Sequence, residues 1–292
     1  MPELPEVETV RRDLQRLTLG LRILAVEVLL PRTVAYPGKE EFEQGLAGTC
    51  LTQWQRRGKY LLGSLDSGAV LGVHLRMTGQ LLWVQGSAPL PVHTRVRLRL
   101  EQGWELRFVD LRTFGQMWLV PAGVEPETVI PALQSLGPEP LSPAFSEIYF
   151  QAALQKSRRP IKTALLDQGL VAGVGNIYAD EALFLSGIHP LTPASQLSDA
   201  AKSRLRQALI EVLRVGLEQR GTTLRDYRDL RGINGNYQGQ AWVYSREGDP
   251  CRLCGTPIQR LKLAGRSAHF CPRCQPPQGQ VATGWRIPRE QL

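Results

Sequence analysis

The sequence predicts an α+β protein in which a short helix and a β-rich domain precede a helical domain and a zinc module. Three observations support this prediction. Residues 21–120 hold short segments rich in branched or alternating side chains, residues 146–219 show helical spacing, and four of the five cysteines lie near the end. Several short strands at such spacing are typical of a sandwich or a barrel. With 292 residues, the chain is long enough for two domains.

The first helix is predicted over residues 5–18, ahead of Gly20. Its apolar side chains recur on one helical face, at Val7, Val10, Leu14 and Leu17. Pro2 and Pro5 suit the first turn of a helix, and the acids Glu3 and Glu6 complement the positive end of its dipole.

The same N-terminus has a second, chemical interpretation. Its small second residue permits removal of Met1, which would leave Pro2 with a free secondary amine. Such an amine attacks a sugar aldehyde carbon and forms an iminium, as lysine amines do. Glu3 and Glu6 lie within one turn of that amine, where carboxylates can move protons. On this segment alone, a plain helix start is the favoured interpretation.

Strand signals follow the first helix, in residues 21–30, 52–65, 70–75, 94–100 and, after a hairpin turn, 104–109. Residues 121–145 are rich in proline and glycine and predict an interdomain connection. Further helices are predicted over residues 146–155, 161–168, 179–185 and 199–219. A polar, glycine-rich loop then runs to about residue 240, followed by a short strand over 241–244.

Four cysteines predict one structural zinc ion, because Cys251-x-x-Cys254 and Cys271-x-x-Cys274 offer four sulfurs to a tetrahedral site. Two disulfides are the alternative, which the lack of a secretion signal disfavours. The intervening segment carries Arg260, Lys262, Arg266 and His269 but no acid, a pattern that favours a nucleic-acid contact over a purely structural ribbon. Cys50 is expected to be a buried thiol.

A Gly-Val-Gly-Asn turn between two helical segments is the second local signal. Gly173 and Gly175 allow a ligand to approach the backbone closely, and the helix after Asn176 offers free amides to a phosphate. Lys162 and Arg158 would add positive charge. An ordinary helical hairpin with a glycine-rich connection explains this segment equally well.

The overall charge points to a polyanionic partner. The formal charge is +8 and the isoelectric point is near 9.5, so nucleic acid is the first candidate. The chain has neither a run of about 18 apolar residues nor a signal-peptide pattern. We therefore expect a cytoplasmic, nucleoid-associated protein with no membrane partner.

Six segments in one order resemble the bacterial formamidopyrimidine-DNA glycosylases over residues 1–275. They are the N-terminal PELPEVET, RRGKYLL (56–62), HLRMTG (74–79), the stretch 110–115, LVAGVGNIYADEALFLSGIHP (170–190) and the four-cysteine finger. The resemblance implies a β-sandwich, then a helix–two-turn–helix domain and a zinc finger. We expect a catalytic domain over residues 1–135, followed by a linker with its first helix over 136–158. The DNA-binding domain is expected over 159–240, the zinc finger over 241–276 and a tail over 277–292.

The resemblance also implies catalytic residues. Pro2 matches the nucleophile of the family, Glu3 its general acid and Glu6 a residue that contacts the base or sugar. Lys59 matches the lysine that contacts phosphate and donates a proton in β-elimination, and Arg266 matches the finger arginine that grips the phosphate at the lesion.

Further positions match DNA contacts of the family. Met77, Arg112 and Phe114 correspond to three residues that fill the void left by an extruded base. Other expected contacts are His74, His93, Arg158, Lys162 and Asn176, and residues 230–240 fall where the family has a lid. Departures occur near these loops: Leu111 and Thr113 replace a frequent proline and a second arginine, and Arg76 replaces the usual glycine.

The expected function is that of a monomeric, bifunctional DNA glycosylase and abasic-site lyase. Its expected partner is duplex DNA that contains oxidised purines (8-oxoguanine or formamidopyrimidines) or abasic sites. Two alternatives are a glycosylase for oxidised pyrimidines, which Leu4 and Val7 disfavour, and a non-catalytic reader of damaged DNA. A reader would have no need of the Pro2-Glu3 pair.

Overall fold

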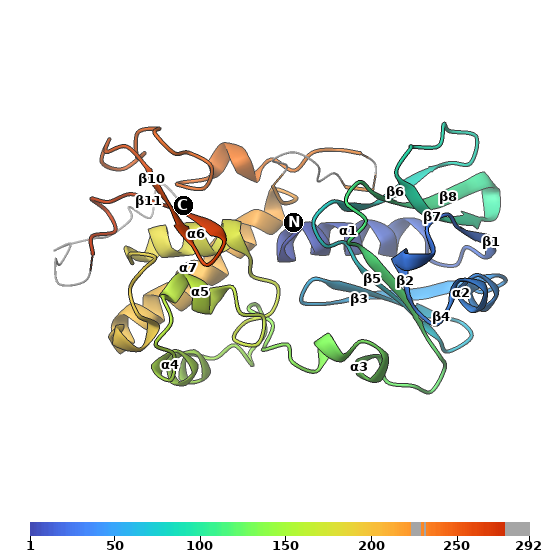
Figure 1. Cartoon of the computed structure of the whole chain (residues 1–292), viewed down its shortest axis with the longest axis horizontal. Coiled ribbons are helices and arrows are strands. Elements are labelled where there is room, and N and C mark those ends of the chain that lie inside the picture. Colours follow the sequence, from blue (N-terminus) through green and yellow to red (C-terminus); the bar gives the residue numbers. More distant parts are fainter. Residues whose placement is uncertain (223–228, 231, 278–292) are drawn as a thin grey trace. The chain divides into compact units, whose positions relative to one another are not determined.

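The computed structural model describes residues 1–222, 229–230 and 232–277 of the chain. Two units form within it: residues 1–135 together with 216–238, and residues 136–215 together with 239 onward. Figure 1 labels their helices and strands. Each unit has its own core, and each is considered separately below. The five-segment division expected from the sequence stays a prediction.

Helix α1 (Leu4–Leu17) opens the N-terminal unit, as predicted. A capping box forms its start, in which the Glu3 side chain accepts from the backbone of Glu6 and the Glu6 side chain accepts from Glu3. Val7, Val10 and Leu14 are buried against the sheets, so the predicted apolar stripe is the packed face.

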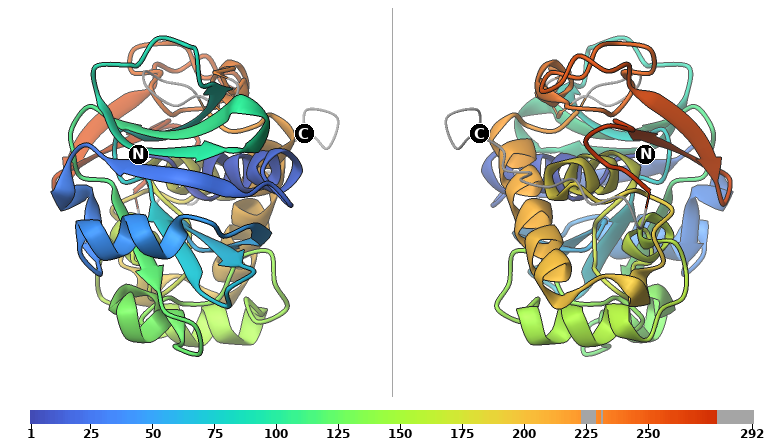
Figure 2. Two further views of the ribbon diagram at one scale, coloured as in Figure 1. Left: turned by 90° about the vertical axis from the view of Figure 1, so that its right-hand side faces the viewer. Right: turned by 90° about the vertical axis from the view of Figure 1, so that its left-hand side faces the viewer.

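Two sheets form a β-sandwich, which confirms the predicted fold class. The five-stranded sheet has the order β2-β9-β5-β4-β3, and the four-stranded sheet has the order β1-β7-β8-β6. Figure 2 shows them as separate layers. Side chains of both sheets and of α1 fill one core, among them Leu61, Val73, Leu98, Phe108 and Met117.

The strand bounds are β1 (Ile23–Val28), β2 (Val34–Tyr36), β3 (Leu51–Arg57), β4 (Tyr60–Leu65), β5 (Val70–His74), β6 (Gly79–Gln85), β7 (Thr94–Leu100), β8 (Trp104–Asp110) and β9 (Gln116–Val120). Short helices are η1 (Pro31–Thr33), α2 (Lys39–Leu46), η2 (Glu101–Gly103), α3 (Pro126–Val129) and η3 (Pro131–Leu133). The strand prediction for residues 52–65 merged β3 and β4, which a Gly58-Lys59 turn separates. Strands β2, β6 and β9 and helix α2 were not predicted.

The second unit is helical at first. It contains α4 (Glu147–Gln155), α5 (Ile161–Leu165), α6 (Asn176–Ser186), η4 (Ala194–Gln196) and most of α7 (Asp199–Glu218). The Gly-rich turn lies between α5 and α6, where Gly173 takes a positive φ of 84°. Gly187 ends α6 in the left-handed conformation. All four predicted helices are present.

After η5 (Tyr237–Gln240), strands β10 (Gln259–Leu263) and β11 (Arg266–Phe270) form a regular antiparallel hairpin. Ala264 and Gly265 make its two-residue turn, both with positive φ. The strand predicted over residues 241–244 is absent. Its backbone amides instead bind the buried carboxylate of Glu181.

Two further expectations concern the ends of the chain and the membrane. Residues 278–292, most of the predicted tail, lie outside the described residues. Among the helices of the described ranges, none is both long enough and apolar enough to cross a bilayer.

Candidate active site and DNA-binding loops

The N-terminal end of α1 gathers the predicted nucleophile and both acids. Pro2 is buried, and Glu3 and Glu6 are 3% and 1% exposed. The backbone N–H of Glu3 donates to Glu6 Oε2 at 2.8 Å. The capping box thus fixes the residue that directly follows Pro2 at the start of α1.

Glu6 also holds the chain at Gly221 and Thr222. Its Oε1 accepts from the backbone N–H of Thr222 at 2.7 Å. A Cβ on Gly221 would lie 2.7 Å from that same oxygen, and Gly221 has φ +83°, so only glycine suits the position. The Glu6 carboxylate therefore joins the start of α1 to the segment that leads into residues 223–228, which lie outside the described structure.

Glu8 and Arg56 connect α1 to the turn that carries Lys59. Arg56 Nε lies 3.1 Å from Glu8 Oε2, and Arg56 Nη1 donates to the carbonyl of Gly58 at 2.9 Å. Although burial raises the pKa of Glu8, hydrogen bonds and charge from Arg11 and Arg56 bring it below its usual value. The side chain of Lys59 is 6% exposed, so the turn presents a largely enclosed ammonium.

His74 lies beside this turn and is neutral. It pairs with Tyr60 across β4 and β5, and the two rings make an edge contact at 4.5 Å. Burial, aided by the charges of Arg76 and Lys59, lowers the pKa of His74 to about 3. Its Nδ1 accepts from the backbone N–H of Arg76 at 3.0 Å, which leaves the proton on Nε2. A neutral N–H donor of this kind suits a phosphate oxygen.

The three predicted void-filling side chains meet at the tips of two loops. Met77 is half-buried, whereas Arg112 and Phe114 are exposed, Phe114 by 52%. Arg112 Nη1 donates to Met77 Sδ at 3.2 Å, and its guanidinium lies 5.0 Å from the centre of the Phe114 ring. The plug loop (residues 75–79) and the wedge loop (residues 110–115) therefore form one cluster.

Asp110 joins these loops at their base. Its Oδ1 accepts from the Thr78 hydroxyl and from the backbone N–H of Arg112 at 3.2 Å, and its Oδ2 accepts from the N–H of Gly115 at 2.7 Å. A Cβ on Gly115 would lie 2.4 Å from the Phe108 ring. The sequence pattern assigns Asp110 no role of its own, and its position directly before the predicted void fillers is the one local signal that points to it.

His93 lies at the start of β7, next to the wedge loop. Its carbonyl accepts from the N–H of Asp110 at 2.9 Å, and its Nδ1 lies 3.2 Å from Arg95 Nη2. Arg95 Nε also donates to the Asp110 carbonyl at 2.8 Å. The predicted DNA contact at His93 is thus near the void fillers in the fold.

Lys162 in the second unit does not have the exposed position expected of a phosphate contact. It is 1% exposed, and its Nζ binds Asp180 Oδ1 at 2.5 Å and the carbonyl of Ser267. Asp180 Oδ2 accepts from the backbone N–H of His269 at 3.0 Å. The DNA contact expected of Lys162 stays a prediction, whereas in the structure its charge joins α5 and α6 to β11, because burying an ammonium requires a close anion.

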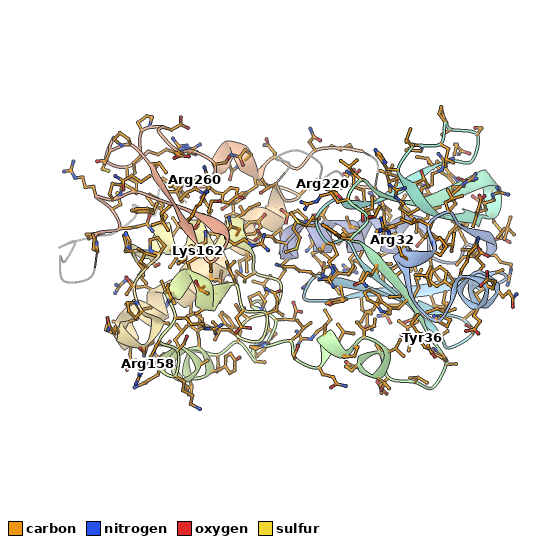
Figure 3. The ribbon with its side chains drawn as sticks, viewed as in Figure 1. Arg32, Tyr36, Arg158, Lys162, Arg220 and Arg260 are labelled. Atoms are coloured by element: carbon orange, nitrogen blue, oxygen red, sulfur yellow. The ribbon has the colours of Figure 1, made fainter. Side chains whose placement is uncertain are left out.

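Asn176 and Arg266 lie on the elements that this ion pair connects. Asn176 is the first residue of α6, its Nδ2 lies 3.4 Å from Ser267 Oγ, and its Oδ1 is buried without a partner among the described residues. Arg266 is exposed at the start of β11, directly after the hairpin turn. Arg158 is also exposed, on the segment before α5 (Figure 3).

The four cysteines form a site that fits zinc. Their ligand atoms all lie within 4.8 Å of one another, and the Cys251–Cys274 and Cys254–Cys271 sulfur pairs are 3.8 and 3.5 Å apart. A tetrahedron with Zn–S bonds of about 2.3 Å has edges of about 3.8 Å. Burial raises the pKa of Cys271 to about 11, so a cation is needed to hold its thiolate. The protein has one structural zinc site.

Comparison with known proteins agrees with this arrangement. Residues 1–117 match the formamidopyrimidine-DNA glycosylase N-terminal domain, residues 136–228 the H2TH domain of the same enzymes, and residues 248–277 a zinc finger found in FPG and IleRS. The chain belongs to the formamidopyrimidine-DNA glycosylase family.

Individual relatives cover nearly the whole chain. A formamidopyrimidine-DNA glycosylase from a Synechococcus strain is 58% identical over 94% of this chain and 99% of its own length. One from Gloeobacter violaceus is 56% identical over 96% of this chain and all of its own length. Among solved structures, a Lactococcus lactis FPG mutant in complex with Fapy-dG containing DNA has a TM-score of 0.87 at 38% identity, covering 94% of this chain and 100% of that one.

Family membership makes the protein an Fpg-type DNA glycosylase that acts on damaged DNA, in a family that carries glycosylase and lyase activity. The predicted enzyme class, zinc and DNA-binding character are confirmed. The roles of individual residues stay predictions. So does the lid expected over residues 230–240, of which residue 231 lies outside the described structure.

Proposed function

We propose that the protein is a bifunctional glycosylase and abasic-site lyase that removes oxidised purines from duplex DNA through the amine of Pro2. The capped start of α1 carries this proposal, because it holds the residue after Pro2 by a 2.8 Å hydrogen bond to Glu6. Zinc is assigned to the cysteines of the finger, and the steps proposed below are written with the amine of Pro2 and with side-chain groups of the chain.

Removal of Met1 frees the Pro2 nitrogen for attack. Its lone pair forms a bond to C1′ of the damaged nucleoside as the bond from C1′ to the base breaks, and the proton that the Pro2 nitrogen loses leaves on the base. Glu3 gives a proton to the sugar ring oxygen, the ring opens, and an iminium joins Pro2 to C1′. The carboxylate of Glu3 is 3% exposed, a setting in which proton transfer is shielded from bulk water.

Strand cleavage then follows from the iminium. It acidifies the C2′ proton, whose loss expels the 3′-phosphate, and a second elimination expels the 5′-phosphate. Water finally hydrolyses the imine and restores the amine. We propose that Lys59 donates the proton that the leaving phosphate takes up, because its ammonium lies in the turn next to His74. We propose that Arg266 binds the phosphate at the lesion.

Borohydride trapping tests this proposal. A duplex with 8-oxoguanine opposite cytosine should give a covalent adduct with the mature protein, and Pro2→Gly should reduce both the adduct and nicking. Glu3→Gln should suppress base excision by about 10²-fold or more while leaving DNA binding nearly unchanged. Absence of an adduct, where a characterised family enzyme forms one, would leave a non-catalytic reader as the better account.

Oxidised pyrimidines are a second substrate class to be tested. A solved structure of the Lactococcus lactis protein, 37% identical with a TM-score of 0.86, is described as a complex with oxidised pyrimidine containing DNA. Excision rates on matched duplexes with an oxidised purine or an oxidised pyrimidine decide between the two classes. We expect the purine to be preferred.

A further inference from the structure

An exposed cationic rim surrounds the tips of the plug and wedge loops. Arg32 on η1, Arg76 on the plug loop and Arg112 on the wedge loop are all exposed. Arg32 Nη2 donates to the hydroxyl of Thr113, the residue between the two void fillers Arg112 and Phe114. Figure 3 labels Arg32. A guanidinium from a distant part of the sequence thus reaches the middle of the wedge loop.

Backbone contacts fix Arg32 at this end of the sandwich. The N–H groups of Leu29 and Leu30 donate to the carbonyl of Arg95 at 2.8 and 3.2 Å. The Arg95 guanidinium in turn donates to the carbonyl of Asp110, where the wedge loop begins. Helix η1, whose side chain Arg32 contacts Thr113, is therefore attached to the same strand end as the wedge loop.

The rim differs from the ion-paired arginines Arg97 and Arg107 of the four-stranded sheet by its lack of anions. Within the described ranges, Arg32, Arg76 and Arg112 form no ion pair with a carboxylate. On β7 and β8, in contrast, Arg97 pairs with Glu27 at 2.7 Å and Arg107 pairs with Glu105 at 2.7 Å. Three like charges without counterions repel one another, and a polyanion relieves that repulsion.

We propose that Arg32 is a DNA-phosphate ligand of the wedge loop and supplies the positive charge that Thr113 does not. The inference deepens the proposed function, since it requires the wedge loop to enter damaged duplex DNA. Thr113 has φ +58°, which turns the loop and sets its hydroxyl as the acceptor for Arg32. Arg32 then lies beside the inserted Phe114, where the backbone of the kinked strand must pass.

The salt dependence of DNA binding tests the role of Arg32. We would measure the dissociation constant for a duplex with a stable abasic-site analogue between about 50 and 200 mM KCl. Each phosphate contact contributes about 0.9 to the slope of log K against log salt. Arg32→Gln, which keeps a donor for Thr113 but removes the charge, should lower the slope by about 0.9, and Arg32→Lys should retain it.

A relocated charge gives the decisive comparison. In the double variant Arg32→Gln/Thr113→Arg, the guanidinium comes from the wedge loop itself, and the slope should return to the wild-type value. Arg22→Gln is the matched control, because Arg22 is also exposed and donates to a neighbouring carbonyl, that of Gly48. Arg22 precedes Ile23, which pairs with Leu100 at the far end of β7, and its loss should leave the slope unchanged.

The outcomes separate this inference from the proposed function. A wild-type slope in Arg32→Gln overturns the inference, as does an equal loss in Arg32→Gln and Arg32→Lys, which would make Arg32 a brace for Thr113 only. A different experiment tests the proposed function: if it is wrong, the wild-type protein gives no covalent adduct in borohydride trapping. Thermal unfolding of each variant confirms that it is folded before its slope is compared.

Discussion

The wedge region and the zinc hairpin present exposed side chains on tight turns, but different forces hold the two turns. Asp110 fixes the plug and wedge loops with hydrogen bonds to Gly115 and Thr78. The hairpin of β10 and β11 is attached through four cysteines and through the buried pair of Lys162 and Asp180. The first region depends on hydrogen bonds from neutral donors to one carboxylate, whereas the second depends on a metal site and an ion pair, so we expect zinc removal to weaken only the second.

Zinc removal should have the largest effect, and only on the hairpin. Structural zinc contributes about 10–16 kcal/mol to folding in finger peptides, far more than any single hydrogen bond. Chelation, or Cys271→Ser, should abolish DNA binding measured by anisotropy while hydrogen exchange of the β-sandwich stays slow. Cys50→Ser is the control and should keep one zinc per chain. Binding that survives full zinc loss would show that the hairpin is not needed.

Breaking the buried ion pair should have the next largest effect. Asp180→Asn leaves the Lys162 ammonium buried without its anion and should cost about 3–5 kcal/mol of unfolding free energy. The double variant Lys162→Met/Asp180→Leu removes both charges and should recover most of the loss. Denaturant unfolding measures both values. Equal losses in the single and double variants would contradict an ionic role for the pair.

Removal of the carboxylate at the base of the wedge should cost less. Asp110→Ala leaves buried donors of Thr78 and Gly115 without an acceptor, for a loss of about 2–3 kcal/mol. We also expect slower base excision with little change in binding to undamaged DNA. Asp66→Ala, which removes an exposed acceptor of one backbone N–H, is the control and should cost less than about 1 kcal/mol.

The smallest effect is a pH dependence of stability. The folded-state pKa of His74 is about 3, below its ordinary 6.5, so the unfolded chain binds more protons between these values. The stability due to neutral His74 is therefore complete above about pH 6.5 and is lost by up to about 1.4 kcal/mol per pH unit below it. Thermal unfolding from pH 8 to 5 should show a flatter profile for His74→Gln. Parallel profiles would refute the assignment.

Local patterns in the sequence predicted the parts of the fold that depend on local physics. The α1 stripe at Val7 and Val10, the cysteine spacing and the glycine turn before Asn176 are each readable within a short window. Helix α2 and the edge strand β2 were missed because they are short, and tertiary packing rather than pattern fixes them.

The candidate site was only partly predictable for a different reason. Lys162 was expected to face phosphate because its charge is visible in the sequence, whereas its partner Asp180 is 18 residues away. Asp110 and Thr78 are 32 residues apart, and Arg32 and Thr113 are 81 apart. The role of a polar residue is set by what the fold places beside it, and no local pattern records that neighbour.

The attachment of the plug and wedge loops to Asp110 has a consequence for the role that we propose for them. Met77, Arg112 and Phe114 lie on loops that share one base, so we expect the three side chains to move as a unit. In the proposed function, they would enter or leave the base stack of a duplex together. The time spent at each base pair would then report how easily the stack opens there.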